Sequence, residues 1–358
     1  MRYLGNKTKL LSFLDGKMKR LEIAPGVAHD AFAGTAAVGR ALKASGWSVH
    51  SSDLMTYSYV MQRAYVVAST VDQLERLAQV VPAVCRAATA PERLTAAAEY
   101  LSTGIAPNDG FFARNFGPAG GRMYFTDENA RRIDAARTVL HDWHIESLVD
   151  DDTFYVLLAA IIEGADRVAN TAGVYAAFIK QWQPNARRNF AVIPELPVHS
   201  TAHSVAHRAD ATEVAARLGE IDLLYVDPPY NSRQYAGYYH VPELIARGWF
   251  ADDVALRGKT GLIDDGEQRS AWCSKRQAPD ALRSLLAATG AAHVLVSYNT
   301  EGVIPDRELR GILADAAVDR FQKRFTKRYK RYRADSDHEG RRYKGDEVSE
   351  LLYHARLR

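Results

Sequence analysis

Asp227-Pro228-Pro229-Tyr230 directly follows the apolar run 221–226, and this junction constrains the fold more than any other segment. Short apolar runs are typical of buried strands, and open α/β sheets keep their binding sites at the carboxyl ends of such strands. The prolines hold φ at about −65° and lack N–H donors, so the Asp227 carboxylate and the Pro228 carbonyl remain acceptors. A planar NH2 group fits between them with Tyr230 against its face, as for an unstacked nucleobase. The same four residues would also form an ordinary turn.

A strand–helix–strand pattern opens the chain, with strands expected over 27–32 and 47–52 and a helix over 36–45. Gly34 lies in the turn after the first strand, where a small residue lets the backbone approach a ligand closely. Asp53 follows the second strand, near the spacing at which an acidic residue reaches the hydroxyls of a ribose. We therefore expect a cofactor that contains a ribose.

The sequence around this turn argues against several classes of cofactor. The Gly-x-Gly-x-x-Gly pattern of dinucleotide sites is absent, and Asp30 at the strand end would repel a pyrophosphate. No phosphate-binding Walker sequence is present either. S-adenosylmethionine fits better, because it carries a ribose, an adenine and a sulfonium but no phosphate.

Between residues 56 and 188 the pattern changes to helical periodicity, with helices expected over 57–69, 71–87, 91–102, 127–143 and 152–169. The Gly-rich stretch 104–122 is predicted to be a surface loop. Strand and helix alternation resumes near Phe190, with strands over 221–226, 293–297 and 348–357 and a helix over 278–288. The pattern predicts a doubly wound α/β domain, split by a helical insert and closed by antiparallel strands.

Composition excludes several classes of protein. Cys85 and Cys273 are the only cysteines and lie far apart, so neither a disulfide framework nor a thiolate zinc site is supported, and a reducing cytoplasm is expected. No secretion signal and no run of 18 apolar residues is present, so no membrane association is expected. His199, His203 and His207 recur every four residues, but Pro197 argues against a helix that would align them as metal ligands, and no metal is expected.

Positive charge is concentrated near the carboxyl end. The net charge is only +3, yet residues 320–333 contain eight Lys or Arg and no acidic residue, interleaved with aromatic rings. Such a segment suits phosphates and stacking, which favours a nucleic acid partner. The alternative is a solvated face of a strand or helix whose aromatic rings point inward.

The order of these motifs, more than any one of them, resembles the Dam-like (alpha-class) adenine-N6-specific DNA methyltransferases. In this family the cofactor loop precedes Asp-Pro-Pro-Tyr, and a DNA-recognition insert separates them. The amino-terminal segment 1–11, Met-Arg-Tyr-Leu-Gly-Asn-Lys-Thr-Lys-Leu-Leu, is also similar to the family's first motif. One departure is Ala36, where relatives often have glycine; a Cβ there opposes positive φ and changes the detail of the loop.

The resemblance implies a Rossmann-like methyltransferase fold that uses S-adenosylmethionine, with residues 1–55 and 189–358 as the catalytic domain and 56–188 as a helical target-recognition insert. It implies a catalytic motif made of Asp227, Pro228, Pro229 and Tyr230. The cofactor-binding residues that it implies are Tyr3, Asn6, Lys7, Asp30, Phe32, Gly34, Thr35, Asp53, Asp210 and Ala211.

The expected substrate is double-stranded DNA, methylated on the exocyclic amine of a flipped adenine by a monomeric enzyme, with a cognate restriction endonuclease as a further partner. Arg, Asn and Gln side chains read base edges, and cations bind phosphates. The expected DNA contacts are Arg114, Asn115, Arg122, Arg233, Gln234, Lys327, Arg328 and Arg331. RNA-base and glutamine methyltransferases share related motifs, but usually lack both this amino-terminal motif and a large insert. A catalytically silent DNA-binding relative is the remaining alternative.

Overall fold

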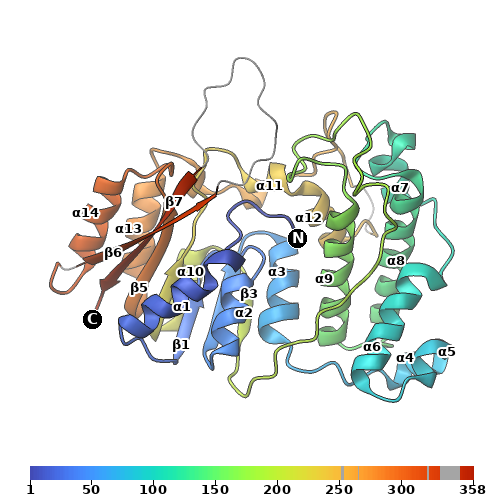
Figure 1. The fold of residues 1–358 in the computed structure, drawn as a ribbon, viewed down its shortest axis with the longest axis horizontal. Coiled ribbons are helices and arrows are strands. Elements are labelled where there is room, and N and C mark those ends of the chain that lie inside the picture. Colours follow the sequence, from blue (N-terminus) through green and yellow to red (C-terminus); the bar gives the residue numbers. More distant parts are fainter. Residues whose placement is uncertain (251–253, 265, 321, 331–346) are drawn as a thin grey trace. The chain divides into compact units, whose positions relative to one another are not determined.

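The computed structural model describes residues 1–250, 254–264, 266–320, 322–330 and 347–358, with the backbone alone at 328–330, 347 and 348. The chain forms two compact units, each assembled from separate segments (Figure 1). The helical unit comprises Met1–Gly5, Met55–Ser200 and Ala236–Gly266. The sheet unit comprises Asn6–Leu54, Thr201–Tyr235 and Glu267–Arg358.

A seven-stranded sheet of order β3-β2-β1-β4-β5-β7-β6 forms the centre of the sheet unit. Strands β1 to β5 are parallel, whereas β7 runs antiparallel to both β5 and β6. The strands are β1 (Val27–Asp30), β2 (Ser48–Asp53), β3 (Val205–Arg208), β4 (Glu220–Val226), β5 (Gly290–Asn299), β6 (Gln322–Lys330) and β7 (Glu347–Arg356). This arrangement confirms the predicted Rossmann-like methyltransferase fold with antiparallel closing strands. Strand order reverses between β1 and β4, which is where sheets of this kind bind ligands.

Helices pack on this sheet because side chains alternate between its two faces. Leu224 and Val226 belong to one apolar core with residues of α10, α13 and α14, whereas the intervening Tyr225 lines a small cavity with residues of α1 on the other face. The helices and turns of the unit are η1 (Thr8–Leu10), α1 (Leu11–Arg20), α2 (Ala37–Ala44), α10 (Ala211–Leu218), η6 (Ala271–Cys273), α13 (Ala278–Ala288) and α14 (Asp306–Ala316).

The helical unit is built around α8 and α9, whose buried faces supply much of its core. Both helices begin at a side chain that accepts a backbone N–H: Thr126 caps α8 and Asp150 caps α9. The elements are α3 (Thr56–Gln62), η2 (Arg63–Val67), α4 (Glu75–Val80), α5 (Pro82–Arg86), α6 (Ala90–Glu99), η3 (Tyr100–Gly104), α7 (Phe111–Phe116), η4 (Pro118–Gly120), α8 (Asp127–Ile145), α9 (Asp151–Val168) and α12 (His240–Arg247). Two short elements lie at unit boundaries in the sequence, α11 (Tyr235–Tyr238) and η5 (Gly266–Gln268).

Three details of the predicted element pattern are wrong. The stretch 104–122 is not a surface loop, because α7 lies within it and buries Phe112 and Phe116 completely. The helix expected over 71–87 is broken, since Pro82 cannot donate to the preceding turn and instead begins α5. Residues 190–204 contain no strand; Phe190 donates its N–H to the Asn129 side chain rather than to a sheet.

The segment after the Asp-Pro-Pro-Tyr motif contributes α12 to the helical unit. The buried Glu243 carboxylate of α12 accepts the N–H groups of Thr56 and Tyr57 at 3.1 and 3.0 Å, which satisfies orphan donors at the start of α3. Arg137 of α8 donates to the carbonyl of Ile245 at 2.8 Å near the end of the same helix. These contacts give the helical unit a component that the predicted insert 56–188 does not include. Within the described residues, no helix is both long and apolar enough to cross a bilayer.

Candidate active site

Asp227 lies immediately after β4, beside the point where strand order reverses. Its side chain is 14% exposed, and Oδ1 forms an ion pair with Nζ of Lys7 at 3.0 Å. The same ammonium lies 5.5 Å from the centre of the Tyr230 ring, whose residue is half-buried. The structure thus brings together Lys7, Asp227 and Tyr230, which the sequence places in two distant motifs.

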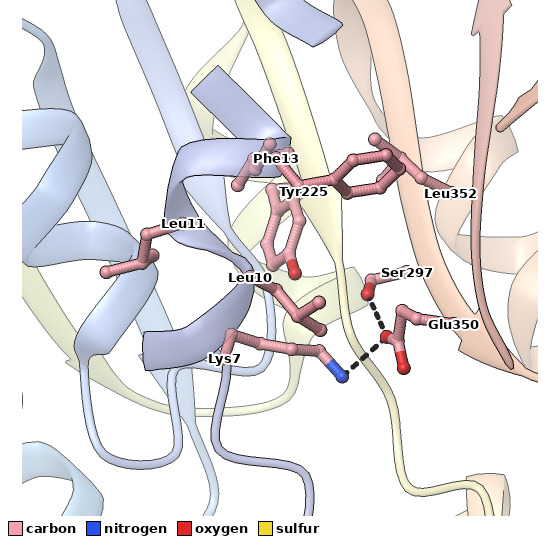
Figure 2. A pocket seen from close by; sticks show the side chains of 9 residues that line it. Lys7, Leu10, Leu11, Phe13, Tyr225, Ser297, Glu350 and Leu352 are labelled. Carbon is pink, nitrogen blue, oxygen red and sulfur yellow. Dashed lines mark hydrogen bonds and ion pairs between the residues drawn. The ribbon is translucent and has the colours of Figure 1, made fainter. Parts of the chain in front are cut away.

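A second carboxylate holds Lys7 from the opposite side. Glu350 of β7 is 2% exposed, and its Oε1 lies 2.8 Å from Lys7 Nζ. Ser297 of β5 donates its hydroxyl to the same oxygen at 2.5 Å. Figure 2 shows Lys7, Ser297 and Glu350 converging in this way, with Tyr225 beside them.

Burial and charge set the ionisation of this cluster. Burial disfavours the Lys7 ammonium, but the Asp227 and Glu350 carboxylates outweigh that effect and raise the pKa of Lys7 above its ordinary value. Burial raises the pKa of Asp227 to about 7, although Lys7 opposes the shift. Burial and the charge of Asp227 likewise raise the pKa of Asp30 to about 7. The site therefore concentrates acidic groups that exchange protons near neutral pH.

The turn after β1 is shaped by hydrogen bonds to acidic side chains. Asp30 Oδ2 accepts the N–H of Gly39 at 3.0 Å, and Asp53 Oδ2 at the end of β2 accepts the N–H of Gly34 at 2.9 Å. Ala36, at φ 59°, adopts the left-handed conformation that a Cβ opposes. The turn therefore keeps a glycine-like backbone although alanine occupies the position.

The other expected cofactor residues fall on several elements around the same sheet. The Asn6 side chain donates to the Thr35 hydroxyl at 3.4 Å, which connects the amino-terminal segment to the β1 turn. The Phe32 ring packs edge-on against Trp272, with 4.9 Å between ring centres. Asp210 caps α10 by accepting the N–H of Thr212, and the adjacent Ala211 is buried.

Tyr3 belongs to the helical unit, unlike Asn6 and Lys7. Its ring packs against Tyr239 with 4.8 Å between centres, and its hydroxyl accepts a hydrogen bond from Tyr57 at 3.3 Å. The cofactor role that the resemblance implies for Tyr3 stays a prediction.

The three DNA-contact candidates of the Gly-rich stretch are engaged with nearby backbone. Arg114 donates to the carbonyls of Asp109 and Gly110, and the Asn115 amide donates to Phe111 within the same helix. Arg122 donates to Asn115, Gly258 and Lys259 at 3.0, 3.2 and 3.1 Å. Arg122 thus holds the turn between Arg257 and Leu262 against the end of α7.

Of the two candidates after the catalytic motif, Arg233 is exposed and Gln234 is engaged. The Gln234 amide donates to the carbonyl of Ser270 at 3.1 Å and accepts its N–H at 2.8 Å. These paired bonds use both ends of the amide, so Gln234 fixes a loop of the sheet unit.

The basic segment forms the edge strand β6, paired only with β7 among the described strands. Lys327 donates to the carbonyl of Lys9 and lies 5.6 Å from the centre of the Phe13 ring. Arg324 pairs with Asp306 at 3.0 Å, so acids from α14 neutralise part of the segment. Arg331 lies outside the described residues, as does the Arg328 side chain.

Ser297 and Glu350 were not among the residues expected from the sequence. The available signal was their position beside apolar runs, with Ser297 after residues 294–296 in β5 and Glu350 before residues 351–353 in β7. Buried charges require partners, so an acid beside such a run indicates a buried cation elsewhere.

Comparisons with known proteins agree with this geometry. The family description D12 class N6 adenine-specific DNA methyltransferase matches residues 3–262. The Type II methyltransferase M.NlaIII of Neisseria lactamica is 33% identical, over 99% of this chain and 98% of its own. The modification methylase LlaI of Lactococcus lactis is 34% identical over 93% of this chain, and the Type II methyltransferase M.FokI of Planomicrobium okeanokoites 31% over 93%.

This chain spans about half the length of the last two relatives, 51% and 50%, but nearly all of the first. The family match covers the amino-terminal motif, the β1 turn and Asp-Pro-Pro-Tyr. It confirms adenine methylation of DNA as the activity expected from the order of these motifs. The chain belongs to the D12 class of N6 adenine-specific DNA methyltransferases.

Proposed function

We propose that the sheet unit binds S-adenosylmethionine and transfers its methyl group to the amine of an adenine flipped out of double-stranded DNA. The observation that supports this most is the contact between Lys7 and Asp227, 3.0 Å apart, beside the acidic ends of β1 and β2. The helical unit supplies target recognition.

The carboxylate groups at the ends of these strands suit S-adenosylmethionine. Asp30 and Asp53 end strands β1 and β2, and Asp210 follows the neighbouring strand β3. These carboxylates would repel a pyrophosphate, whereas they accept hydroxyl hydrogens and tolerate a sulfonium. Asp53 binds the ribose, and Asp210 with Ala211 binds the adenine. Gly34 and Thr35 line the turn beneath it, with Phe32, Asn6 and Lys7 as further contacts. When bound, S-adenosylmethionine supplies an electrophilic methyl group.

Asp227 and the Pro228 carbonyl each accept one N–H of the adenine amine. The amine lone pair is delocalised into the ring, and two fixed acceptors hold the nitrogen pyramidal and stabilise the positive charge that arises on it. The amine nitrogen that takes up the methyl group would have to release one proton. Burial raises the pKa of Asp227 to about 7, so its carboxylate can take that proton. Pro229 keeps the motif stiff.

Tyr230 stacks on the flipped base and replaces stacking lost from the duplex, which costs a few kcal/mol. The ring is half-buried and meets the Tyr298 ring edge-on, with 6.5 Å between centres, so its orientation is supported from behind.

The proposed DNA contacts include residues that also bond nearby backbone. Arg233, Lys327, Arg328 and Arg331 bind phosphates or base edges, and Arg114 and Asn115 face DNA from the helical unit. Arg122 and Gln234 also hold loops, because their polar groups bond backbone carbonyls.

The relatives are named as type II methyltransferases or modification methylases. By analogy, we infer that this chain protects DNA from a cognate restriction endonuclease. It acts as a monomer in the cytoplasm, where its DNA substrate and reduced cysteines belong.

The test is modification sequencing of DNA from cells that express this chain alone, compared with cells that express Asp227→Ala. We expect N6-methyladenine in one sequence context with the parent and none with the variant. Methylated cytosine, methylated RNA without methylated DNA, or equal modification by the variant would contradict the proposal.

A further inference from the structure

Glu350 reaches the catalytic motif through Lys7. Its Oε1 lies 2.8 Å from Lys7 Nζ, and the same nitrogen lies 3.0 Å from Asp227 Oδ1. Lys7 thus bridges two carboxylates that come from β7 and from the end of β4. The group of three carries a net charge of −1 when all are ionised, rather than the neutral charge of a simple Lys–Asp pair.

The described surroundings of Glu350 are too tight for a ligand. The adjoining cavity has a volume of about 10 Å³, at the lower limit for one water, and is lined mainly by apolar side chains such as Leu10, Leu11 and Leu352 (Figure 2). A carboxylate enclosed in this way costs free energy unless it is paired. Any role of Glu350 is therefore expected to act through its contacts with Lys7 and Ser297.

We propose that Glu350, oriented by the Ser297 hydroxyl, is a positioning residue that holds the Lys7 ammonium against one oxygen of Asp227. The other Asp227 oxygen is thereby presented to the substrate amine. This proposal rests on the proposed function of Asp227.

Glu350 also shares the positive charge of Lys7. Without it, the ammonium would be balanced by Asp227 alone, which would weaken Asp227 as an acceptor at the point where the substrate amine becomes positive. Glu350 contributes to the raised pKa of Asp227, after burial and against Lys7. Among the other ionisable groups, Tyr225 of β4 acts on Lys7 and Asp30 of β1 interacts with Asp227, whereas Asp53 of β2 acts on Asp30.

The central test is Glu350→Gln, which keeps the shape and removes the charge. We expect single-turnover methyl transfer to fall about tenfold or more, and the acid limb of kcat/KM to move to lower pH, because Asp227 loses a nearby negative charge. Affinity for S-adenosylmethionine should change less than the rate. Glu350→Asp should restore part of the rate and move the limb back.

A double-mutant cycle separates this role from simple stabilisation. In a Lys7→Met background, Glu350→Gln should have little further effect on the rate, because Glu350 then no longer positions Asp227 through Lys7. Glu243→Gln is the matched control, since Glu243 is another buried glutamate paired with a cation, Arg247 at 2.7 Å. That control should lower stability and leave the pH profile unchanged.

Two outcomes would overturn the inference. In the first, Glu350→Gln keeps the parental rate of methyl transfer and the parental acid limb of kcat/KM. In the second, Glu350→Gln lowers the rate of methyl transfer by the same factor with and without Lys7. If Glu350→Gln does not fold, Ser297→Ala decides, and an unmoved rate and limb would then refute the proposal. Asp227→Ala is assayed in parallel. Retained activity there refutes the proposed catalytic role itself, whereas a dead Asp227 variant beside an unaffected Glu350 variant refutes only the positioning role.

Discussion

The carboxylate of Asp53 accepts the backbone N–H of Gly34 at 2.9 Å, so the end of β2 and the turn after β1 are joined by one hydrogen bond. The residue expected to bind the ribose therefore also holds the turn that is expected to approach the cofactor. Both roles use the same negatively charged group, which makes hydrogen bonds stronger than neutral ones.

Asp53→Ala should weaken binding of S-adenosylmethionine at least tenfold. Two charge-assisted bonds to the ribose would disappear, each worth roughly 1.5 to 3 kcal/mol, and the Gly34 N–H would no longer have its acceptor. Calorimetric titration measures this, with DNA affinity as the control that should stay close to the parent. Unchanged cofactor affinity would remove the ribose assignment.

Asp227→Ala should reduce methyl transfer by about 10² to 10³ and leave cofactor binding detectable, because the carboxylate acts on the target amine. The Lys7 ammonium would keep Glu350 as its partner. Labelled-methyl transfer to DNA by the purified variant gives the rate. A rate near the parental value would refute the mechanism.

Ala36→Gly should stabilise the protein by about 1 kcal/mol, because Ala36 has φ 59° and the left-handed region costs a non-glycine residue roughly 1 to 2 kcal/mol, partly offset by glycine's greater freedom when unfolded. Urea unfolding measures the change. Ala41→Gly, in the interior of α2, is the control and should destabilise by a similar amount. A decrease in stability in Ala36→Gly would show that the methyl group contributes more by packing than it costs in strain.

Acid should weaken the fold through His29. Burial, with His207 and His50 nearby, lowers the pKa of His29 to about 3, so between pH 6.5 and 3 the unfolded chain takes up a proton that the folded chain does not. This contribution to stability is complete above about pH 6.5 and declines as pH falls, by about 1.4 kcal/mol at pH 5.5.

Subtracting a His29→Gln variant isolates this effect from the carboxyl groups. Asp30 and Asp227 act in the opposite direction, because their raised pKa values near 7 make the folded state bind protons first as pH falls. Denaturant unfolding at pH 7.5 and 5.5 should therefore give a parent-minus-variant difference that shrinks at the lower pH. A constant difference would contradict the assignment.

The basic strand is tested by replacing Lys327, Arg328 and Arg331 with glutamine. If they bind phosphates, affinity for all DNA sequences should fall alike, and the slope of log K against log salt should flatten by about 0.9 for each phosphate that is no longer neutralised. Sequence preference should remain, because phosphates carry no base information. Arg324→Gln is the control, since Asp306 already pairs with that side chain. A parental slope in the triple variant would assign these residues to a solvated face.

Strands β1, β2, β4 and β5 and helix α13 could be predicted because their signals are local: strand-length runs and an apolar face of helical period. The short parallel strand β3 (Val205–Arg208) was not predicted. Helix α7 was missed because glycines surround it, although Phe112 and Phe116 are spaced four apart as on one helix face. The role of Glu350 could not be predicted. Its partners Lys7 and Ser297 lie far away in the sequence, and only the pairing of β7 with β5 brings the glutamate to them.

If the helical unit carries target recognition, as we propose, its composite make-up limits how specificity can be exchanged between relatives by recombination. The first N–H groups of α3 donate to the Glu243 carboxylate, and Glu243 lies after the Asp-Pro-Pro-Tyr motif in the sequence. A crossover that transplanted residues 55–200 alone would leave foreign α3 donors facing the host's α12. Functional chimeras must therefore inherit 55–200 and 236–266 from one parent, so these segments are expected to diverge as a linked pair.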